Sequence, residues 1–190
     1  MMRKILLAAV AALALSACGQ GGSGPALPQV QEGAQAPSVQ VRPPGQTQRG
    51  EFNEEVHTQL RQNMLEQLNA IGQNFAAGQA PPAGFEDQIL TLEPGTDHRW
   101  QVSLTGGQPY TFIGACDGDC TNVDIELISV TTGGVVASDM LPDDYPVVQF
   151  TPPADGQFIV RTLLQNCTVT PCYVGTRGLT PGAAGAEAPK

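Results

Sequence analysis

The chain has 190 residues, enough for one folded domain of ordinary size and too few for two once non-globular segments are set aside. Hydrophobic residues make up 41% of the chain and charged residues only 14%, and 22 Gly and 16 Pro supply many turns. The net charge of -9 argues against binding of nucleic acid and against attraction to an anionic lipid surface, because both need a basic patch.

Residues 1–17 have the pattern of an export signal. Two basic residues precede an apolar run, Ile5 to Leu15, which is too short to span a bilayer. The run ends in Leu-Ser-Ala immediately before Cys18, a pattern that resembles the lipobox of bacterial lipoproteins. The resemblance implies cleavage before Cys18 and attachment of acyl chains to that residue, which would anchor the protein stably in a membrane. The alternative is ordinary signal-peptide cleavage after Ala14.

The residue after Cys18 indicates which membrane of the cell envelope the protein is anchored to. It is Gly19 rather than Asp, which in the lipoprotein family implies export to the outer membrane. Cleavage removes two of the nine basic residues and none of the 18 acidic ones, so the mature chain carries a net charge of -11. We therefore expect an acidic protein of the bacterial cell envelope, anchored by lipid to the outer membrane rather than the inner one.

Residues 18–50 are expected to form a disordered tether behind the lipidated cysteine. The segment is rich in Gly, Pro and Gln, and its few apolar residues follow no period. Such a composition cannot bury enough apolar surface to offset the entropy of ordering. As a flexible coil it would hold the folded part roughly 30 Å from the lipid headgroups. Residues 179–190, which are rich in Gly, Pro and Ala, are expected to be a disordered tail.

Residues 51–78 are predicted to form an amphipathic helix. Asn53 can cap its start, and Gly78 followed by two prolines can end it. Apolar residues recur at spacings of three and four positions, at Val56, Leu60, Met64, Leu68, Ile71 and Phe75. A helix with one apolar stripe must pack against something. Packing on the chain's own β domain is favoured, and the alternative is self-association or docking to an envelope partner through residues 52–77.

Residues 85–178 are predicted to form the β domain. Apolar and polar residues alternate, as in Trp100 to Leu104, and turn residues recur at short intervals. In the segment Val123 to Leu127, the apolar side chains face one way while Asp124 and Glu126 face the other. About eight strands without intervening helices predict an all-β fold, an antiparallel β-sandwich of jelly-roll type preceded by the single helix.

Four cysteines remain beside Cys18, namely Cys116, Cys120, Cys167 and Cys172. An exported protein is expected to carry them as two disulfides, and gaps of three and four residues do not have the usual zinc-ligand spacing. A long-range bridge would stabilise the fold by about 4 kcal/mol and a local one by about 2 kcal/mol. The turn Asp117–Asp119 favours a local bridge between Cys116 and Cys120. The local pairing is our preferred prediction, and the long-range pairings stay open.

Several strand-and-turn motifs between residues 86 and 177 together follow the pattern of one domain family. They are Leu92–Gly95, Trp100–Leu104, Gly107–Phe112, Asn122–Leu127, Gly134–Ala137 and Gly156–Val160. Together these motifs resemble the bacterial pre-peptidase C-terminal domain, with Asp124 in place and Glu126 substituting for the second Asp of its "D-x-D-L" strand. The segment Cys116–Cys120, with Asp143–Pro146 downstream, resembles a disulfide-containing branch of that group.

The family resemblance implies a β-sandwich module that is not itself catalytic. Such modules are appended to secreted peptidases and other exported proteins, and they have implied roles in secretion, solubility or substrate binding. In this chain the module follows a tether and a helix rather than a peptidase. That difference weighs against a role as a protease accessory.

An acidic stretch lies between Arg99 and Arg161, where the sequence has no basic residue. Carboxylates on adjacent loops are the ligands that calcium prefers, and the candidate ligands are Asp117, Asp119, Asp124, Asp143 and Asp144. The stretch is not an EF-hand, because Asn122 and Ile128 occupy the positions where that loop needs Gly and Glu. The alternative is that these residues start turns and stay solvated. No other cofactor is predicted.

No catalytic residue is predicted. His57 falls on the helix and His98 in a turn before a strand, and no serine occupies a Gly-x-Ser-x-Gly motif. We therefore expect a non-catalytic, lipid-anchored envelope protein that presents its β-sandwich to a protein, peptide or glycan ligand. The alternative is a structural lipoprotein that docks through its helix into an envelope assembly. An exposed aromatic or acidic groove would favour binding, and an exposed helical stripe would favour docking.

Overall fold

The structure is a computed structural model that describes residues 22–40 and 48–182. The expectations made for the signal peptide, for Cys18 and for the last residues of the tail therefore lie outside the described residues. Within them, the chain forms one helix and twelve strands. Four of the strands are two-residue pairings: β1 (Gly22–Ser23), β2 (Gln48–Arg49), β3 (Gln79–Ala80) and β11 (Val169–Thr170).

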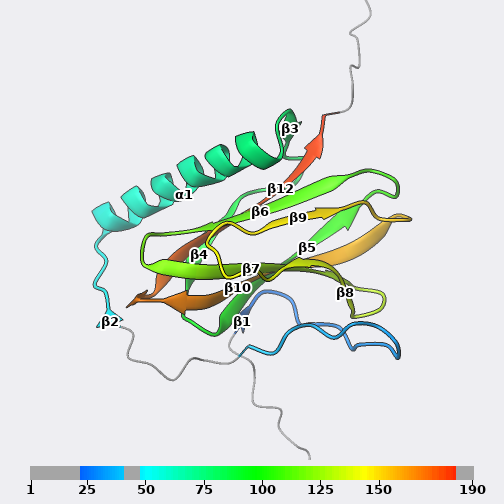
Figure 1. Ribbon diagram of the computed structural model, residues 1–190, viewed down its shortest axis with the longest axis horizontal. Coiled ribbons are helices and arrows are strands. Elements are labelled where there is room, and N and C mark those ends of the chain that lie inside the picture. The colour runs from blue at the N-terminus through cyan, green and yellow to red at the C-terminus, as the bar shows by residue number, and fades with distance from the viewer. Residues whose placement is uncertain (1–21, 41–47, 183–190) are drawn as a thin grey trace, which may run out of the picture.

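The remaining eight strands form two antiparallel sheets that face each other, as Figure 1 shows. The first sheet has the order β5-β10-β7-β8, with bounds Thr96–Leu104, Gly156–Cys167, Cys120–Ser129 and Val135–Asp139. In the second sheet, β12 (Cys172–Pro181) pairs on one side with β4 (Gln88–Leu92) and β3, and on the other with β6 (Tyr110–Cys116), which pairs with β9 (Val147–Phe150). The predicted antiparallel β-sandwich is confirmed.

The core between the sheets follows the predicted alternation. Its side chains come from both sheets: Trp100, Val102, Leu104, Tyr110, Phe112, Ile125, Leu127, Val148, Phe158 and Val160. Thr162 and Thr176 hydrogen-bond through their hydroxyls within this interior, with 2.5 Å between the oxygens. The two buried polar groups thus satisfy each other, as burial requires.

The helix α1 (Glu54–Phe75) packs on the outer face of the second sheet. The side chain of Asn53 accepts the first hydrogen bond, from the amide of Val56 at 2.9 Å, as the capping prediction required. Met64 and Leu68 are fully buried against Ile113, Ala115, Tyr173 and Leu179. Packing on the chain's own β domain, the favoured alternative, is therefore what the structure contains.

The N-terminal strap, residues 22–40, corrects the prediction of a disordered tether for this part of the chain. Its first residues pair in parallel with the edge of β5, where Gly22 lies opposite Asp97. Further along, the amide of Gln31 donates to the Thr132 carbonyl, and the Gln35 carbonyl accepts from the amide of Val135, both at 2.8 Å. Residues 48–50 are also bound, because β2 pairs with β11. Backbone hydrogen bonds hold these segments, so their side-chain composition gave no sign of order.

The strap and the helix cover opposite sides of the sandwich, as Figure 1 shows. The strap lies on the outer face of the first sheet, where Ile159, Arg161 and Leu163 of β10 are all buried. This face would be open to solvent in an uncovered sandwich, since the alternate side chains of β10 already fill the core. The molecule therefore has four layers: strap, sheet, sheet and helix.

The end of the domain also differs from its predicted boundary. β12 continues to Pro181, and Thr180 pairs with Ala80 of β3. Leu179 and Thr180 are buried, so residues 179–181 belong to the sandwich rather than to a tail. Among the residues described, no helix combines the length and apolarity needed to cross a bilayer.

Candidate functional site

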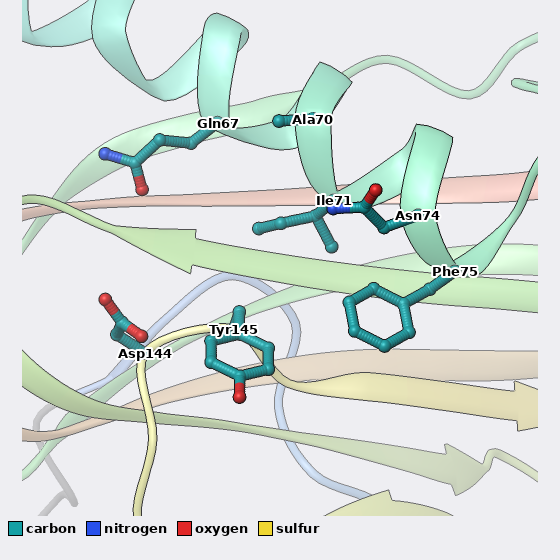
Figure 2. A pocket seen from close by; sticks show the side chains of 7 residues that line it. All are labelled: Gln67, Ala70, Ile71, Asn74, Phe75, Asp144 and Tyr145. Carbon is teal, nitrogen blue, oxygen red and sulfur yellow. The ribbon is translucent and has the colours of Figure 1, made fainter.

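An open groove lies between the C-terminal half of α1 and the β8–β9 loop, residues 140–146. Its volume is about 390 Å³. The helix and the loop line it with Gln67, Ala70, Ile71, Asn74, Phe75, Asp144 and Tyr145. Figure 2 shows these side chains converging from the two elements on one space. The helix that forms one wall of the groove lies on the side of the sandwich opposite the strap.

Two aromatic rings form the apolar part of the groove. Phe75 and Tyr145 are each 46% exposed, whereas most other aromatic side chains of the domain are buried or half-buried. The ring centroids are 6.1 Å apart and the planes differ by 20°. Figure 2 shows both rings face-on and next to each other. Together they make a continuous aromatic surface that is open to a ligand.

Phe75 was predicted to belong to the buried stripe of the helix, and that prediction is wrong for this residue. Met64 and Leu68 face the sheet, but Phe75 is the last residue of α1 and its ring meets Tyr145 in the β8–β9 loop instead. Ala76, the next residue, is buried in the cluster that α1 forms with the sheet, so at this end of the helix Ala76 rather than Phe75 faces the strands.

The loop that carries Tyr145 is held on both sides. The amide of Tyr145 donates to the carboxylate of Asp143 at 3.2 Å, and the carbonyl of Asp143 accepts from Val123 of β7 at 3.0 Å. Pro146 is buried, and its carbonyl accepts from Gly114 of β6 at 2.9 Å. These contacts fix the backbone on either side of the ring, so the aromatic surface is a built feature of the fold.

Polar groups at the groove are available to a ligand. Gln67 and Asn74 contribute amides and Asp144 contributes a carboxylate. In the part of the chain that the structure describes, no side-chain hydrogen bond or ion pair engages any of the three. The groove therefore combines an apolar aromatic surface with unused polar groups, as small ligand sites commonly do.

The five carboxylates proposed as calcium ligands are not gathered into one site. Within residues 22–40 and 48–182, no group of three or more His, Cys, Asp or Glu is arranged to hold a metal ion. Asp117 accepts the amide of Tyr173 at 2.6 Å and that of Asp119 at 3.3 Å, and burial raises its pKa. This carboxylate holds the turn against β12, a structural role. Asp119 accepts a weak hydrogen bond from Thr168 at 3.4 Å, also a structural contact.

The other three candidate calcium ligands, Asp124, Asp143 and Asp144, have different roles in the structure. Asp124 is buried on β7, where Gln165 donates to its Oδ2 at 2.6 Å. Desolvation raises the pKa of Asp124 to about 6, helped by the negative charge of Asp139, Glu126 and Asp143 and opposed by the Gln165 hydrogen bond. Asp143 fixes the loop, and Asp144 lines the groove. The turn-forming alternative thus describes Asp117 and Asp143 best.

The disulfides have the local pairing. Cys116 is joined to Cys120 and Cys167 to Cys172, with Cα–Cα distances of 5.8 and 6.0 Å. The four cysteines lie in one buried cluster with Leu92, Val123, Leu164 and Val174. The hydroxyl of Thr168 donates to the Asp119 carbonyl at 3.0 Å and so connects the two disulfide loops. The cysteines are part of the structural core at this end of the sandwich.

Neither histidine lies in a catalytic arrangement. His57 bonds to the hydroxyl of Tyr173 and so joins the helix to β12. His98 contacts the hydroxyl of Ser23 at 2.9 Å, and its other nitrogen faces the amide oxygen of Gln88 at 3.3 Å. Burial lowers the pKa of His98, and no carboxylate orients its ring as in a serine hydrolase. The contact between His98 and Ser23 fastens the first residues of the strap to β5.

Sequence reasoning missed the groove because its two rings lie 70 positions apart. Phe75 was assigned to the helix stripe, and Tyr145 follows two aspartates in a loop without regular pattern. The only signal was an aromatic residue in a loop of turn-forming residues, where burial is not expected. Asp144 was selected, although as a metal ligand rather than as part of this groove.

Comparison with known families identifies the N-terminus. Residues 2–18 match the family described as a prokaryotic membrane lipoprotein lipid attachment site. A search of curated proteins gives no match for the chain. The family match ends on the cysteine that the lipobox resemblance marked, so the chain is a bacterial lipoprotein, held in the cell envelope by lipid on Cys18.

Proposed function

We propose that this lipoprotein is a non-catalytic binding module that captures a protein, peptide or glycan ligand in the groove between α1 and the β8–β9 loop. The observation that carries the proposal is the exposed aromatic pair, Phe75 and Tyr145, on a backbone fixed by hydrogen bonds. Exposed aromatic surface costs free energy in water, and a rigid patch of it is typical of interaction sites.

The alternative, docking of the helix into an envelope assembly, is less well supported. Its apolar stripe would have to face the partner, yet Met64 and Leu68 are fully buried against the chain's own sheet. The opposite face of α1 is polar, with residues such as Gln59, Asn63 and Glu66. Of the stripe, only Phe75 is exposed, and it belongs to the groove.

The absence of catalysis is likewise a proposal. It is supported by the two histidines, which hold the helix and the strap, and by the four cysteines of the sandwich, which form structural disulfides. Outer-membrane location is proposed from Gly19 alone. The resemblance of residues 86–177 to the pre-peptidase C-terminal domain is supported at the level of fold class only, by the eight-stranded antiparallel sandwich.

Site-specific photocrosslinking in cells tests the proposal. A photoreactive amino acid at Asn74, which lines the groove, is expected to capture a ligand of the envelope. The same amino acid at Asn63, exposed on the polar face of the same helix, is the matched control and is expected to capture none. Loss of the Asn74 product in the double variant Phe75→Ala/Tyr145→Ala would support the aromatic pair as the binding surface.

Either of two results would contradict the proposal. Equal products from Asn63 and Asn74, or an Asn74 product that survives removal of both rings, would reject the groove as the binding site. Because both rings are half exposed, their removal is expected to leave the fold intact. Circular dichroism and thermal melting of the double variant check that point.

A further inference from the structure

We propose that the groove binds a positively charged side chain, lysine or arginine, of a polypeptide partner; this inference rests on the proposed function and specifies its ligand. The aromatic pair supplies the first reason. The face of an aromatic ring carries partial negative charge and attracts a cation within about 6 Å. Phe75 and Tyr145 present two such faces side by side, so a cationic group can contact both rings at once.

The charges beside the two rings are negative and therefore attract a cation. Asp144 places a carboxylate next to Tyr145 at the wall of the groove. Phe75 is the last residue of α1, and the last turn of this helix has no basic residue. The C-terminal end of a helix carries a partial negative charge, which a cation normally balances. The rings thus lie between a carboxylate and an uncompensated helix end, and both favour a positively charged ligand.

Within the described residues, the protein has no cation of its own to occupy this place. They contain five arginines and no lysine. Each arginine already has a partner: Arg49 with Glu93, Arg61 with the Ile89 carbonyl, Arg99 with Asp97, Arg161 with Asp97 and Glu126, and Arg177 with Asp87. Arg61 of α1 donates to the carbonyl of Ile89 in β4, and Arg177 of β12 donates to Asp87 and to Asn69 of α1. The negative charge at the groove therefore remains for a ligand.

The position of the lipid anchor favours a polypeptide over a cationic lipid headgroup. Gly22 is bound to β5 and lies four residues after Cys18, so at most about 14 Å of chain separates them. The strap covers one side of the sandwich and the helix covers the other. The helix wall of the groove is thus on the side of the sandwich opposite the strap, through which the chain leads to its anchor. Met140 and Leu141, both exposed, lie in the same loop as Tyr145 and offer apolar contacts to a peptide that continues past its charged residue.

The test is a binding measurement on the lipidated mature protein in non-ionic detergent. The probe is the fluorescent peptide acetyl-Lys-Leu-Lys-Leu-Lys-amide, and its control has every lysine acetylated. We expect the charged peptide to bind roughly tenfold more tightly, which corresponds to about 1.4 kcal/mol of cation–aromatic and charge contacts. Asp144→Asn and Tyr145→Ala are each expected to weaken binding several-fold, whereas Glu55→Gln, which removes one charge from the other end of α1, is expected to change it little.

The outcomes separate this inference from the proposed function. Equal binding of the charged and acetylated peptides, or equal losses in Asp144→Asn and Glu55→Gln, would overturn the preference for a cation. If neither peptide binds while the Asn74 crosslink in cells persists, the groove binds a ligand of another class and only this inference fails. If vesicles of phosphatidylcholine bind through Tyr145 and the peptide does not, the cation is a lipid headgroup and the choice of a polypeptide is wrong.

Discussion

Arg161 of β10 and Glu126 of β7 lie directly opposite each other in the first sheet, and Nη1 of the arginine is 2.8 Å from Oε2 of the glutamate. Arg161 is completely buried, and its Nε contacts Asp97 at 2.5 Å. The strap completes this cluster from outside. The carbonyl of Ser38 accepts from Arg161 and the amide of Ser38 donates to Glu126, both at 2.8 Å.

Replacing Arg161 by Met should strongly destabilise the fold. The substitution leaves Glu126 buried without a cation and Asp97 with Arg99 as its remaining partner, and breaking a buried ion pair in this way costs about 3–5 kcal/mol. Urea denaturation measures the loss in free energy of unfolding. Glu93→Gln, which breaks the exposed pair between Arg49 and Glu93, is the control and should cost less than about 1 kcal/mol. A similar small loss for both variants would show that the cluster contributes little.

Two glycines of the strap allow a matched test of its docking. Both have a positive φ, 99° at Gly24 and 83° at Gly33. A Cβ at Gly24 would lie 1.8 Å from the carbonyl oxygen of Arg99 on β5, whereas one at Gly33 would meet nothing within 4 Å. Gly24→Ala should therefore release the start of the strap, and Gly33→Ala should cause only the backbone strain common to both. Hydrogen exchange of residues 22–40 should rise much more in the first variant; equal exchange in the two would contradict the docked strap.

Asp124 should make stability depend on pH. The pKa of about 6 in the folded protein lies above the ordinary value of 3.8, so the folded state holds this proton more tightly than the unfolded state. The contribution of Asp124 to stability therefore falls as the pH rises from about 4 to 6. Asp124→Asn keeps an acceptor for Gln165 and removes the charge, so it should stabilise the protein at pH 7.5 by on the order of 1–3 kcal/mol.

The gain from Asp124→Asn should shrink as the pH falls toward 4, because the folded aspartate becomes protonated below its pKa of about 6 and no longer carries a buried charge. Urea denaturation of variant and parent at pH 4.5, 6 and 7.5 measures it. His98 acts in the opposite direction, because its lowered pKa makes stability rise with pH, but it is present in both proteins and cancels in the difference. A difference that does not change with pH would show that Asp124 is charged throughout this range.

Cys18→Ser should abolish lipid attachment. The lipid attachment match ends at this residue, and serine has no sulfur to receive an acyl group. Labelling of cells with radioactive palmitate should mark the parent protein and leave the variant unmarked, with the variant recovered in the soluble fraction. The four other cysteines form disulfides and should not be labelled. Labelling of the serine variant would place the acyl group elsewhere.

Local patterns were enough to predict the sandwich, the helix and the local disulfides. The alternation of Val123, Ile125 and Leu127 identified the inward side of β7 correctly, because pleating alone decides which residues share a face. The helix start was predicted from Asn53, whose side chain acts within three residues of sequence. Each of these features depends on residues close together in the chain.

Features that join distant segments could not be predicted in this way. Asp124 and Glu126 were correctly assigned to the outward side of β7, yet both are buried. Glu126 is covered because Ser38, 88 positions earlier, lies against it. The strap makes these contacts with backbone groups, which every residue possesses, so its sequence carries no distinctive pattern. The groove depends in the same way on the meeting of Phe75 and Tyr145.

The bound strap shortens the distance that the domain of this lipoprotein can move from its lipid anchor. A free tether of residues 18–50 would let the domain sample a shell roughly 30 Å deep, whereas the pairing of Gly22 with β5 leaves a stem of only three residues beyond Cys18. The domain then moves with its lipid in two dimensions, and the proposed binding groove stays at a nearly constant height. A partner of the proposed groove would therefore have to be held at that height, where its effective concentration is high.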